Sequence, residues 1–309
     1  IDTILQKFSQ PTPLFVGDVS PLVKDIMVRD VVHIHEDATL FEALQLIDKH
    51  DVRVLPVTDE NKQLKGYLSI FQMGDYFIPK FQQPRVMRQV HTSINDVVTT
   101  LKAEVIFVRD EDSLEDMYVK IGAMDIRSFG KFTRSDAIPS NETIIIVGDR
   151  WDIQQRSIQI GVRLLVITGS LGVDQEVIDL AREKGVSLII SPYDSATTAW
   201  TIRTASRISK LVESNSAVFG PDQRLNQVSR RIANSNAQAF MVTGEGDRLI
   251  GLFTKTDVLK PNKTNLILVD HNEMSQAVPG ASDVNIKEVI DHHRLGINTA
   301  QPIRLINDP

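Results

Sequence analysis

The 309-residue sequence contains no cysteine, which excludes disulfide bridges and metal sites built on thiolates and fits a cytoplasmic protein. None of its apolar runs approaches the roughly 20 residues that a helix needs to cross a bilayer. Lys and Arg number 34 against 40 Asp and Glu, so the net charge is −6 and a broad basic face is lacking. We therefore expect neither a membrane nor a nucleic acid as partner.

The chain does contain an internal repeat, in which residues 37–72 align without a gap on residues 222–257 at a constant offset of 185. In the first copy, Thr39-x-x-Glu42 is a capping-box pattern that predicts the start of a helix. In the second copy, we expect Asp222 to cap the corresponding helix. The strands expected in the two copies span residues 52–57 and 64–68, and residues 237–242 and 249–253.

Two sequence segments in the repeat resemble a CBS (cystathionine-β-synthase) domain, which works as a tandem pair. They are Arg53-Val-Leu-Pro-Val57, with Gly66, in the first copy and Gly251-Leu-Phe-Thr254-Lys-Thr-Asp257 in the second. In that family, a Gly, then Thr or Ser, then Asp three residues later lines a cleft for an adenosine nucleotide.

The resemblance implies that Gly251, Thr254 and Asp257 bind an adenine nucleotide in the second copy. A carboxylate can accept from both ribose hydroxyls, and a hydroxyl can bind phosphate. The first copy offers Ser69 and Arg53 but has Gln72 in place of the acid, so we expect a weaker or altered site there. The alternative is that Thr254 and Asp257 only cap the next helix.

Residues 88–212 have a different character, with strands and helices that alternate and so predict a parallel sheet covered by helices. The expected strands are residues 142–148, 162–167 and 186–190, and the expected helices are residues 152–160, 174–184 and 195–212. Asp149-Arg150 and Thr168-Gly169-Ser170 resemble the motif of a DRTGG domain, with Ser in place of the last Gly. We expect a structural turn there rather than a ligand site. The family's association with subunit contact implies a homodimer.

Near the end of the sequence, Asp270 follows the apolar run Leu266–Val269, and an expected helix containing Ile286, Val289 and Ile290 leads into Asp291-His292-His293-Arg294. Active-site groups of open parallel sheets collect at the carboxyl ends of strands. Carboxylates combined with imidazoles suit Mn²⁺, Mg²⁺ or Zn²⁺.

These two motifs together resemble the DHH phosphoesterase superfamily and, within it, the family II inorganic pyrophosphatases. The resemblance implies that Asp270 bridges two metal ions and that His292 binds one of them. His293 would contact the substrate phosphate, and Asp291 would orient a histidine. His271 and Asn272 are expected to support these groups.

The domain order, CBS–DRTGG–CBS followed by the DHH motifs, is also that of a subset of these pyrophosphatases. The resemblance therefore implies hydrolysis of pyrophosphate to two phosphates, with two or more Mn²⁺ ions per complete site, or Co²⁺ or Mg²⁺ instead. It implies regulation by AMP, ADP, ATP or diadenosine polyphosphates: mono- and diphosphates inhibit and longer adenine nucleotides activate.

The chain begins at Ile1 and ends at Pro309, just after an apolar stretch that starts at Pro302, and both ends are expected to be cut points in a larger protein. The family's first metal motif and its basic pyrophosphate clamp are missing from this sequence. We therefore expect no appreciable hydrolysis by this chain alone, even with Mn²⁺.

The expected fold class is α/β: a tandem CBS pair flanking a DRTGG α/β domain, followed by a partial DHH parallel-sheet domain. One alternative is a stand-alone adenine-nucleotide sensor, and another is a DHH phosphoesterase acting on oligonucleotides or polyphosphate, against which Asn272 argues. The expected boundaries are 1–20 for a linker, 21–87 for the first CBS domain, 88–212 for the DRTGG domain, 213–262 for the second CBS domain and 263–309 for the DHH part.

Overall fold

The computed structural model describes residues 2–78, 82, 86–135, 138–214, 217–260, 264–294, 296 and 304–306. Ile1, Pro302, Pro309 and the expected boundary at residues 262 and 263 lie outside this set. The chain forms two compact units, one of residues 1–31, 61–64 and 215–309 and the other of residues 32–60 and 65–214. In the described part of the chain, every helix is too short or too polar to cross a membrane.

The second of these units contains a six-stranded sheet with the order β4-β6-β7-β8-β9-β5. Its strands are β4 (Gln89–Thr92), β5 (Glu104–Phe107), β6 (Glu115–Ile121), β7 (Thr143–Val147), β8 (Leu164–Ile167) and β9 (Ser187–Ile190). The four central strands are parallel, as expected, whereas the edge strands β4 and β5 run antiparallel to their neighbours. The strands β4, β5 and β6 were not predicted from the sequence.

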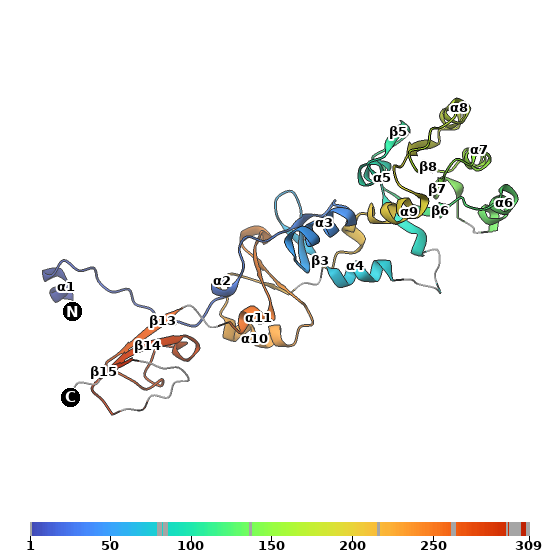
Figure 1. Ribbon diagram of the computed structural model, residues 1–309. Helices are drawn as coiled ribbons and strands as arrows, with labels where there is room; N and C mark the ends of the chain where they lie inside the picture. The colour runs from blue at the N-terminus through green and yellow to red at the C-terminus, as the bar shows by residue number, and fades with distance from the viewer. Residues whose placement is uncertain are drawn as a thin grey trace. The chain divides into compact units, whose positions relative to one another are not determined.

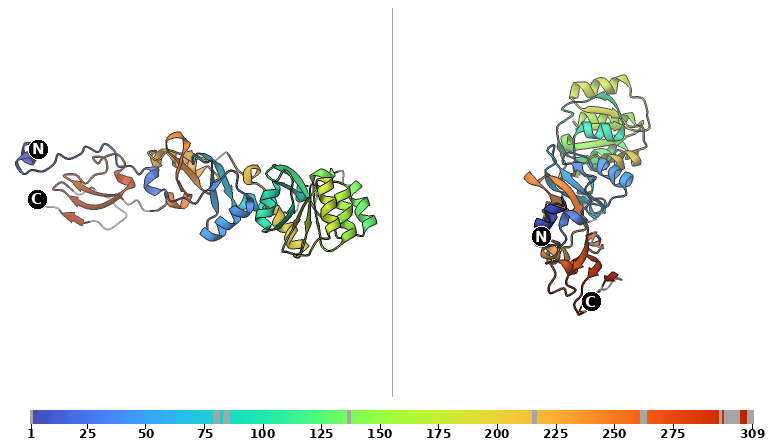
Figure 2. Two further views of the ribbon diagram at one scale, coloured as in Figure 1. Left: turned by 90° about the horizontal axis from the view of Figure 1, so that it is seen from above. Right: turned by 90° about the vertical axis from the view of Figure 1, so that its left-hand side faces the viewer.

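Helices cover both faces of this sheet (Figures 1 and 2). They are α5 (Ile94–Leu101), α6 (Ile126–Ser135), α7 (Trp151–Gln159), α8 (Gln175–Lys184) and α9 (Ser195–Thr204). Successive side chains of a strand point to opposite faces. Accordingly, Ile144 and Ile146 of β7 pack in one core with α5 and α9, and Ile145 and Val147 pack in the other with α6, α7 and α8. Burial on both faces explains the unbroken apolar run of β7.

The helix expected over residues 195–212 ends early, at Thr204. The next residues leave the helical conformation because their backbone groups bond elsewhere. The carbonyl oxygen of Ser206 accepts from Leu40 N at 2.8 Å, and Arg207 N donates to the carbonyl of His91 at 2.7 Å. A short 3₁₀ turn, η3 (Ile208–Lys210), follows.

Each repeat copy forms a three-stranded sheet with flanking helices. Two strands of each sheet were expected from the repeat, and the first strand of each copy was not. The first copy comprises β1 (Ile34–His35), α3 (Leu40–His50), β2 (Val54–Thr58), β3 (Leu64–Ser69) and α4 (Ile70–Phe77). The second comprises β10 (Val218–Phe219), α10 (Leu225–Ala233), β11 (Phe240–Thr243), β12 (Leu249–Phe253) and α11 (Lys255–Val258). Shorter elements elsewhere are α1 (Asp2–Lys7), α2 (Val23–Ile26), η1 (Val86–Arg88), η2 (Ser140–Glu142), η4 (Glu245–Asp247) and η5 (Ala281–Asp283).

One of the two expected helix caps is confirmed. Thr39 N donates to Glu42 Oε2 at 2.7 Å and Glu42 N donates to Thr39 Oγ1 at 3.2 Å, which is the capping box. The prediction for Asp222 is wrong, because α10 begins at Leu225 with Arg224 as its N-cap. Asp222 instead accepts a hydrogen bond from Lys24 Nζ at 2.7 Å.

The C-terminal part forms a sheet of β13 (Asn265–Val269), β14 (Asn285–Ile290) and β15 (Arg304–Ile306), in which both pairings are parallel. The helix expected around Ile286, Val289 and Ile290 is therefore wrong, since these residues belong to β14. Val289 is fully buried opposite Leu268 of β13. The apolar spacing of three and four residues suits a helix, but the pairing with β13 decides in favour of a strand.

The segment preceding each repeat copy pairs with the third strand of the other copy. Glu213 forms a bridge with Tyr67 of β3, and Val28 forms one with Leu252 of β12. These pairs are equivalent, because 28 and 213, like 67 and 252, differ by the repeat offset of 185. A glycine precedes the paired strand residue in both copies, where the two backbones approach closely.

We predict that Gly66→Ala destabilises the protein by about 1–3 kcal/mol, because the packing around this residue leaves no room for a methyl group. A Cβ at Gly66 would lie 2.4 Å from the carbonyl oxygen of Glu213 and 2.7 Å from Val212 Cγ1. The measurement is urea denaturation followed by circular dichroism. Gly74→Ala is the control: it lies in α4 with no atom within 4 Å, so Ala should be neutral or slightly stabilising. Equal midpoints for the two variants would contradict this packing.

Candidate functional sites

The second repeat copy places Thr254 and Asp257 at the start of α11. Thr254 N and Oγ1 donate to Asp257 Oδ2 at 2.8 and 2.7 Å, and Lys260 Nζ donates to Oδ1 at 2.6 Å. Burial opposes ionisation of Asp257, but the hydrogen bonds from Lys260 and Thr254 outweigh it and lower its pKa. The carboxylate is thus ionised beside a cation and a hydroxyl. Capping geometry is present, and the nucleotide role stays a prediction.

Gly251 and Arg53, the other residues expected to bind nucleotide, have backbone roles in the structure. A Cβ at Gly251 would lie 2.7 Å from Met27 Sδ and 2.9 Å from the carbonyl oxygen of Val28, so the incoming segment alone requires a glycine there. Arg53 is exposed, and its carbonyl accepts from Ile70 N at 3.1 Å, beside the start of α4. Their ligand contacts remain predictions.

The first repeat copy places Ser69 as the N-cap of α4, with the Ser69 backbone N–H donating to Gln72 Oε1. Gln72 Nε2 donates to Glu213 Oε2 at 2.7 Å, and Tyr67 Oη donates to the same oxygen at 2.8 Å. Burial, followed by the hydrogen bond to Glu213, raises the pKa of Tyr67 to about 12. Glu213 and Tyr67 were not predicted from the sequence, because their contact joins residues 146 positions apart.

The DHH motifs come together at one edge of the C-terminal sheet. Asp270 directly follows β13 and Asp291 directly follows β14, and parallel neighbouring strands end at the same edge. Ligand atoms of Asp270, Asp291, His292 and His293 all lie within 4.8 Å of one another. Within this group, His292 Nδ1 and Asp270 Oδ1 lie 3.5 Å apart. Oxygen and imidazole donors at this spacing fit a divalent cation such as Mn²⁺.

Asp291 is the buried centre of this cluster, with its side chain 1% exposed. Its Oδ1 accepts from His293 Nδ1 at 2.7 Å and from His292 N at 2.9 Å, and its Oδ2 accepts from Asn272 Nδ2. Burial opposes ionisation, but the hydrogen bonds from His293 and Asn272 outweigh it and lower the pKa of Asp291 to about 2. In turn, Asp291 raises the pKa of His293. This geometry matches the expected orienting role of Asp291, which stays a prediction.

Asn272 and His271 take different positions beside the cluster. Asn272 is 2% exposed and donates both to Asp291 and to the carbonyl of Arg294, while its Oδ1 accepts from Gly296 N at 2.7 Å. It therefore ties the chain after β14 to the loop after β13. His271 is half-buried, and its Nδ1 contacts the carbonyl of Val269 at 2.9 Å.

The two halves of the DRTGG motif lie beside each other, after β7 and β8. Thr168 N donates to the carbonyl of Val147 at 3.0 Å. Ser170 adopts a left-handed φ of 54°, which a glycine would adopt without strain, and its N–H donates to the carbonyl of Ser191. Arg150 pairs with Asp152 at 2.8 Å. These internal bonds agree with the expected structural turn.

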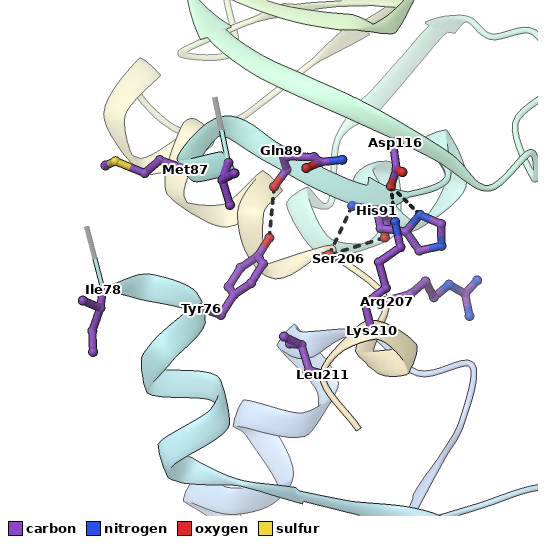
Figure 3. A pocket seen from close by; sticks show the side chains of 11 residues that line it. Tyr76, Ile78, Met87, Gln89, His91, Asp116, Ser206, Arg207, Lys210 and Leu211 are labelled. Carbon is purple, nitrogen blue, oxygen red and sulfur yellow. Dashed lines mark hydrogen bonds and ion pairs between the residues drawn. The ribbon is translucent and has the colours of Figure 1, made fainter. Parts of the chain in front are cut away.

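A cavity of about 160 Å³ lies in the unit of residues 32–60 and 65–214, and sequence reasoning did not anticipate it. In Figure 3, Asp116 Oδ1 is bonded to His91 Nδ1 at 2.7 Å and to Lys210 Nζ at 2.6 Å. Arg207, also in the lining, pairs with Asp96 at 2.7 Å. Because Lys210 and Arg207 both pair with carboxylates, the cavity has no strong preference for an anion. Its lining residues are Tyr76, Ile78, Val86, Met87, Gln89, His91, Asp116, Ser206, Arg207, Lys210 and Leu211.

Family models match three regions of the chain and define its class. The CBS domain model matches residues 23–73 and 208–261, and the DRTGG domain model matches residues 96–205. The chain is thus a CBS–DRTGG–CBS protein, and the α/β fold class is confirmed. The second CBS match begins before the boundary expected at residue 213, and the expected boundaries remain predictions.

Whole-chain comparison then identifies the relatives: the chain is homologous to manganese- and cobalt-dependent inorganic pyrophosphatases over 99% of its length. It is 25% identical over 310 residues to a probable manganese-dependent inorganic pyrophosphatase of Thermotoga maritima. It is 27% identical over 308 residues to the cobalt-dependent inorganic pyrophosphatase of Clostridium perfringens. The chain spans 55% of the length of each relative.

Comparison with solved structures supports the fold. The CBS and DRTGG domains of the regulatory region of the Clostridium perfringens pyrophosphatase, complexed with the activator diadenosine tetraphosphate, match with a TM-score of 0.66 and 24% identity. The match covers 76% of this chain and all of that chain.

We predict that Asp270→Asn lowers the affinity of the chain for Mn²⁺ at least about tenfold, because it removes an anionic donor that faces His292. Isothermal titration calorimetry with MnCl₂ measures the effect. Asp283→Asn removes the same charge from an exposed position of the same unit and should leave the affinity unchanged. Equal losses in both variants would indicate only non-specific attraction of the cation.

Proposed function

We propose that this chain is the adenine-nucleotide-binding regulatory region, together with part of the catalytic site, of a metal-dependent inorganic pyrophosphatase. The observation that carries the proposal is the cluster of Asp270, Asp291, His292 and His293 in a chain that also holds two CBS domains and a DRTGG domain. Homology to pyrophosphatases over 99% of the chain supports the same assignment.

In this proposal Asp270 and His292 hold divalent cations, Mn²⁺ or Co²⁺ with Mg²⁺ as an alternative. When bound, such ions polarise phosphoryl oxygens and lower the pKa of an attacking water. Asp291 accepts the Nδ1 proton of His293, which leaves Nε2 to face a phosphate oxygen. The raised pKa of His293 favours its protonated form, which donates to the charge that develops on the leaving phosphate.

Adenine nucleotides would regulate the reaction through the CBS domains. Asp257 would accept from the ribose hydroxyls and Thr254 would bind phosphate, while AMP or ADP would inhibit and ATP or diadenosine polyphosphates would activate. A ligand can act only by binding two conformations with different affinities.

A route for such coupling exists within one unit. Val19 N donates to the carbonyl of Pro279 at 2.9 Å, and Asp18 pairs with Arg224, the N-cap of α10. The segment around residue 19 therefore contacts both the loop between β13 and β14 and the second CBS domain. A shift of α10 on nucleotide binding would pull on that loop.

We also propose a homodimer, because in the family that the sequence resembles the DRTGG domain is associated with subunit contact. Two alternative functions remain distinct from the proposal. A pure nucleotide sensor would bind AMP but would stay inert in its complete form, and another DHH phosphoesterase would prefer oligonucleotides or polyphosphate. The combination of CBS and DRTGG domains with homology to pyrophosphatases favours pyrophosphate.

We predict that Asp257→Ala weakens AMP binding about 10- to 100-fold, the loss expected for a charge-assisted hydrogen-bond acceptor. Calorimetry with AMP provides the measurement, and thermal melting shows whether the variant stays folded. Asp257→Asn keeps a side-chain oxygen that can cap α11. If Asp257 only capped the helix, this variant would bind AMP as tightly as the unaltered chain. Glu245→Ala, an exposed charge between β11 and β12, is the matched control and should bind AMP normally.

We predict that the complete polypeptide carrying this chain hydrolyses pyrophosphate with Mn²⁺ or Co²⁺ and that His293→Gln reduces the rate constant at least about 100-fold, the lower range for loss of a general acid. Phosphate release from pyrophosphate and from a short oligonucleotide is compared in one assay. Faster turnover of the oligonucleotide would favour the other phosphoesterase class. Inertness toward both substrates, with AMP binding intact, would favour the sensor.

A further inference from the structure

The two CBS copies hold their acidic residue in different places. In the second copy, the third helical position of α11 is Asp257, and the equivalent position of the first copy is Gln72. The reverse holds for the segment that pairs with the third strand: it carries Val28 beside β12 but Glu213 beside β3. Each copy therefore has one carboxylate across these two positions.

Glu213 is held firmly beside β3. Its backbone exchanges two hydrogen bonds with Tyr67, at 3.0 and 3.2 Å, and its side chain accepts from Tyr67 Oη and Gln72 Nε2. Gly66 admits this close backbone approach. The Tyr67 hydroxyl stays protonated at neutral pH, because its pKa is about 12, and so remains a donor.

The carboxylate of Glu213 is also available to a ligand. Both side-chain hydrogen bonds reach Oε2, and among the described residues Oε1 accepts none. Glu213 is exposed, and its hydrogen bond from Gln72 holds it near the start of α4, the helix that Ser69 caps. A carboxylate oxygen with this freedom can accept from a vicinal diol, as Asp257 would in the second copy.

We propose that Glu213 is the ribose-binding carboxylate of a second adenine-nucleotide site, formed by the first CBS copy and the segment that follows the DRTGG domain. Gln72 and Tyr67 position this carboxylate, and Ser69 completes the site. The inference rests on the proposed binding of adenine nucleotides but not on pyrophosphate hydrolysis. It replaces the expectation that Gln72 leaves this site without a charged acceptor.

A purely structural role for Glu213, tying its segment to β3, would leave the ribose unrecognised. The two roles differ in their response to the ligand's 2′-hydroxyl. The test uses the full chain with Asp257→Asn, which weakens the other site, and measures binding of AMP and 2′-deoxy-AMP by calorimetry, with and without Glu213→Gln.

With Glu213 present, we expect AMP to bind at least about tenfold more tightly than 2′-deoxy-AMP, the effect of one charge-assisted hydrogen bond. Glu213→Gln should weaken AMP binding by a similar factor and reduce the preference for AMP to less than about twofold. Glu183→Gln, an exposed charge in α8, is the control and should change neither value. Tyr67→Phe removes only one of the hydrogen-bond donors to Glu213 and should cause a smaller loss of AMP affinity. This variant still tests the site if Glu213→Gln fails to fold.

The inference is overturned if Glu213→Gln leaves the preference for AMP intact, or weakens both ligands equally. It is also overturned if the chain binds one AMP and Asp257→Asn abolishes that binding, although the proposed function would then survive. Absence of AMP binding in the unaltered chain would defeat the proposed function itself.

Discussion

The close backbone contact at two equivalent glycines is the constraint on which the two CBS domains of this molecule depend. Gly66 and Gly251 each leave room for a segment that belongs, by sequence, to the other repeat copy. In each copy, the residues of this segment lie near the N-terminus of the helix that follows the third strand, α4 in the first copy and α11 in the second. Whether a copy carries its carboxylate on the helix, as at Asp257, or on the segment, as at Glu213, the same small region receives it.

A similar principle governs the sheet edge that carries the candidate metal ligands. The parallel pairing of β13 and β14 brings Asp270 and Asp291 to one end of the sheet although 20 residues separate them. Asn272 then fixes the buried Asp291 through a direct hydrogen bond, and Asp291 fixes the ring of His293. A residue after β13 thus supports a residue after β14, which in turn orients its own neighbour, so these side chains are positioned by hydrogen bonds within the protein.

Much of this architecture could be predicted because its signals are local. The capping box at Thr39 and the apolar runs of β7, β8 and β13 depend on neighbouring residues. The failures involve long-range pairing: the spacing in β14 suits a helix until β13 is beside it, and Asp222 could not be known to face Lys24. Glu213 was missed for the same reason, since nothing near it in sequence marks it as a partner of Tyr67.

The two ends of the DRTGG domain lie together, where Arg207 donates to the carbonyl of His91. Chain segments that enter and leave a domain at one point allow that domain to be excised or replaced without disturbing its host. The DRTGG domain is therefore an insertion whose two ends meet at one point of the first CBS copy. Changes within this domain can leave the CBS sheets undisturbed, provided that the chain leaving it still brings residue 213 to β3 in register.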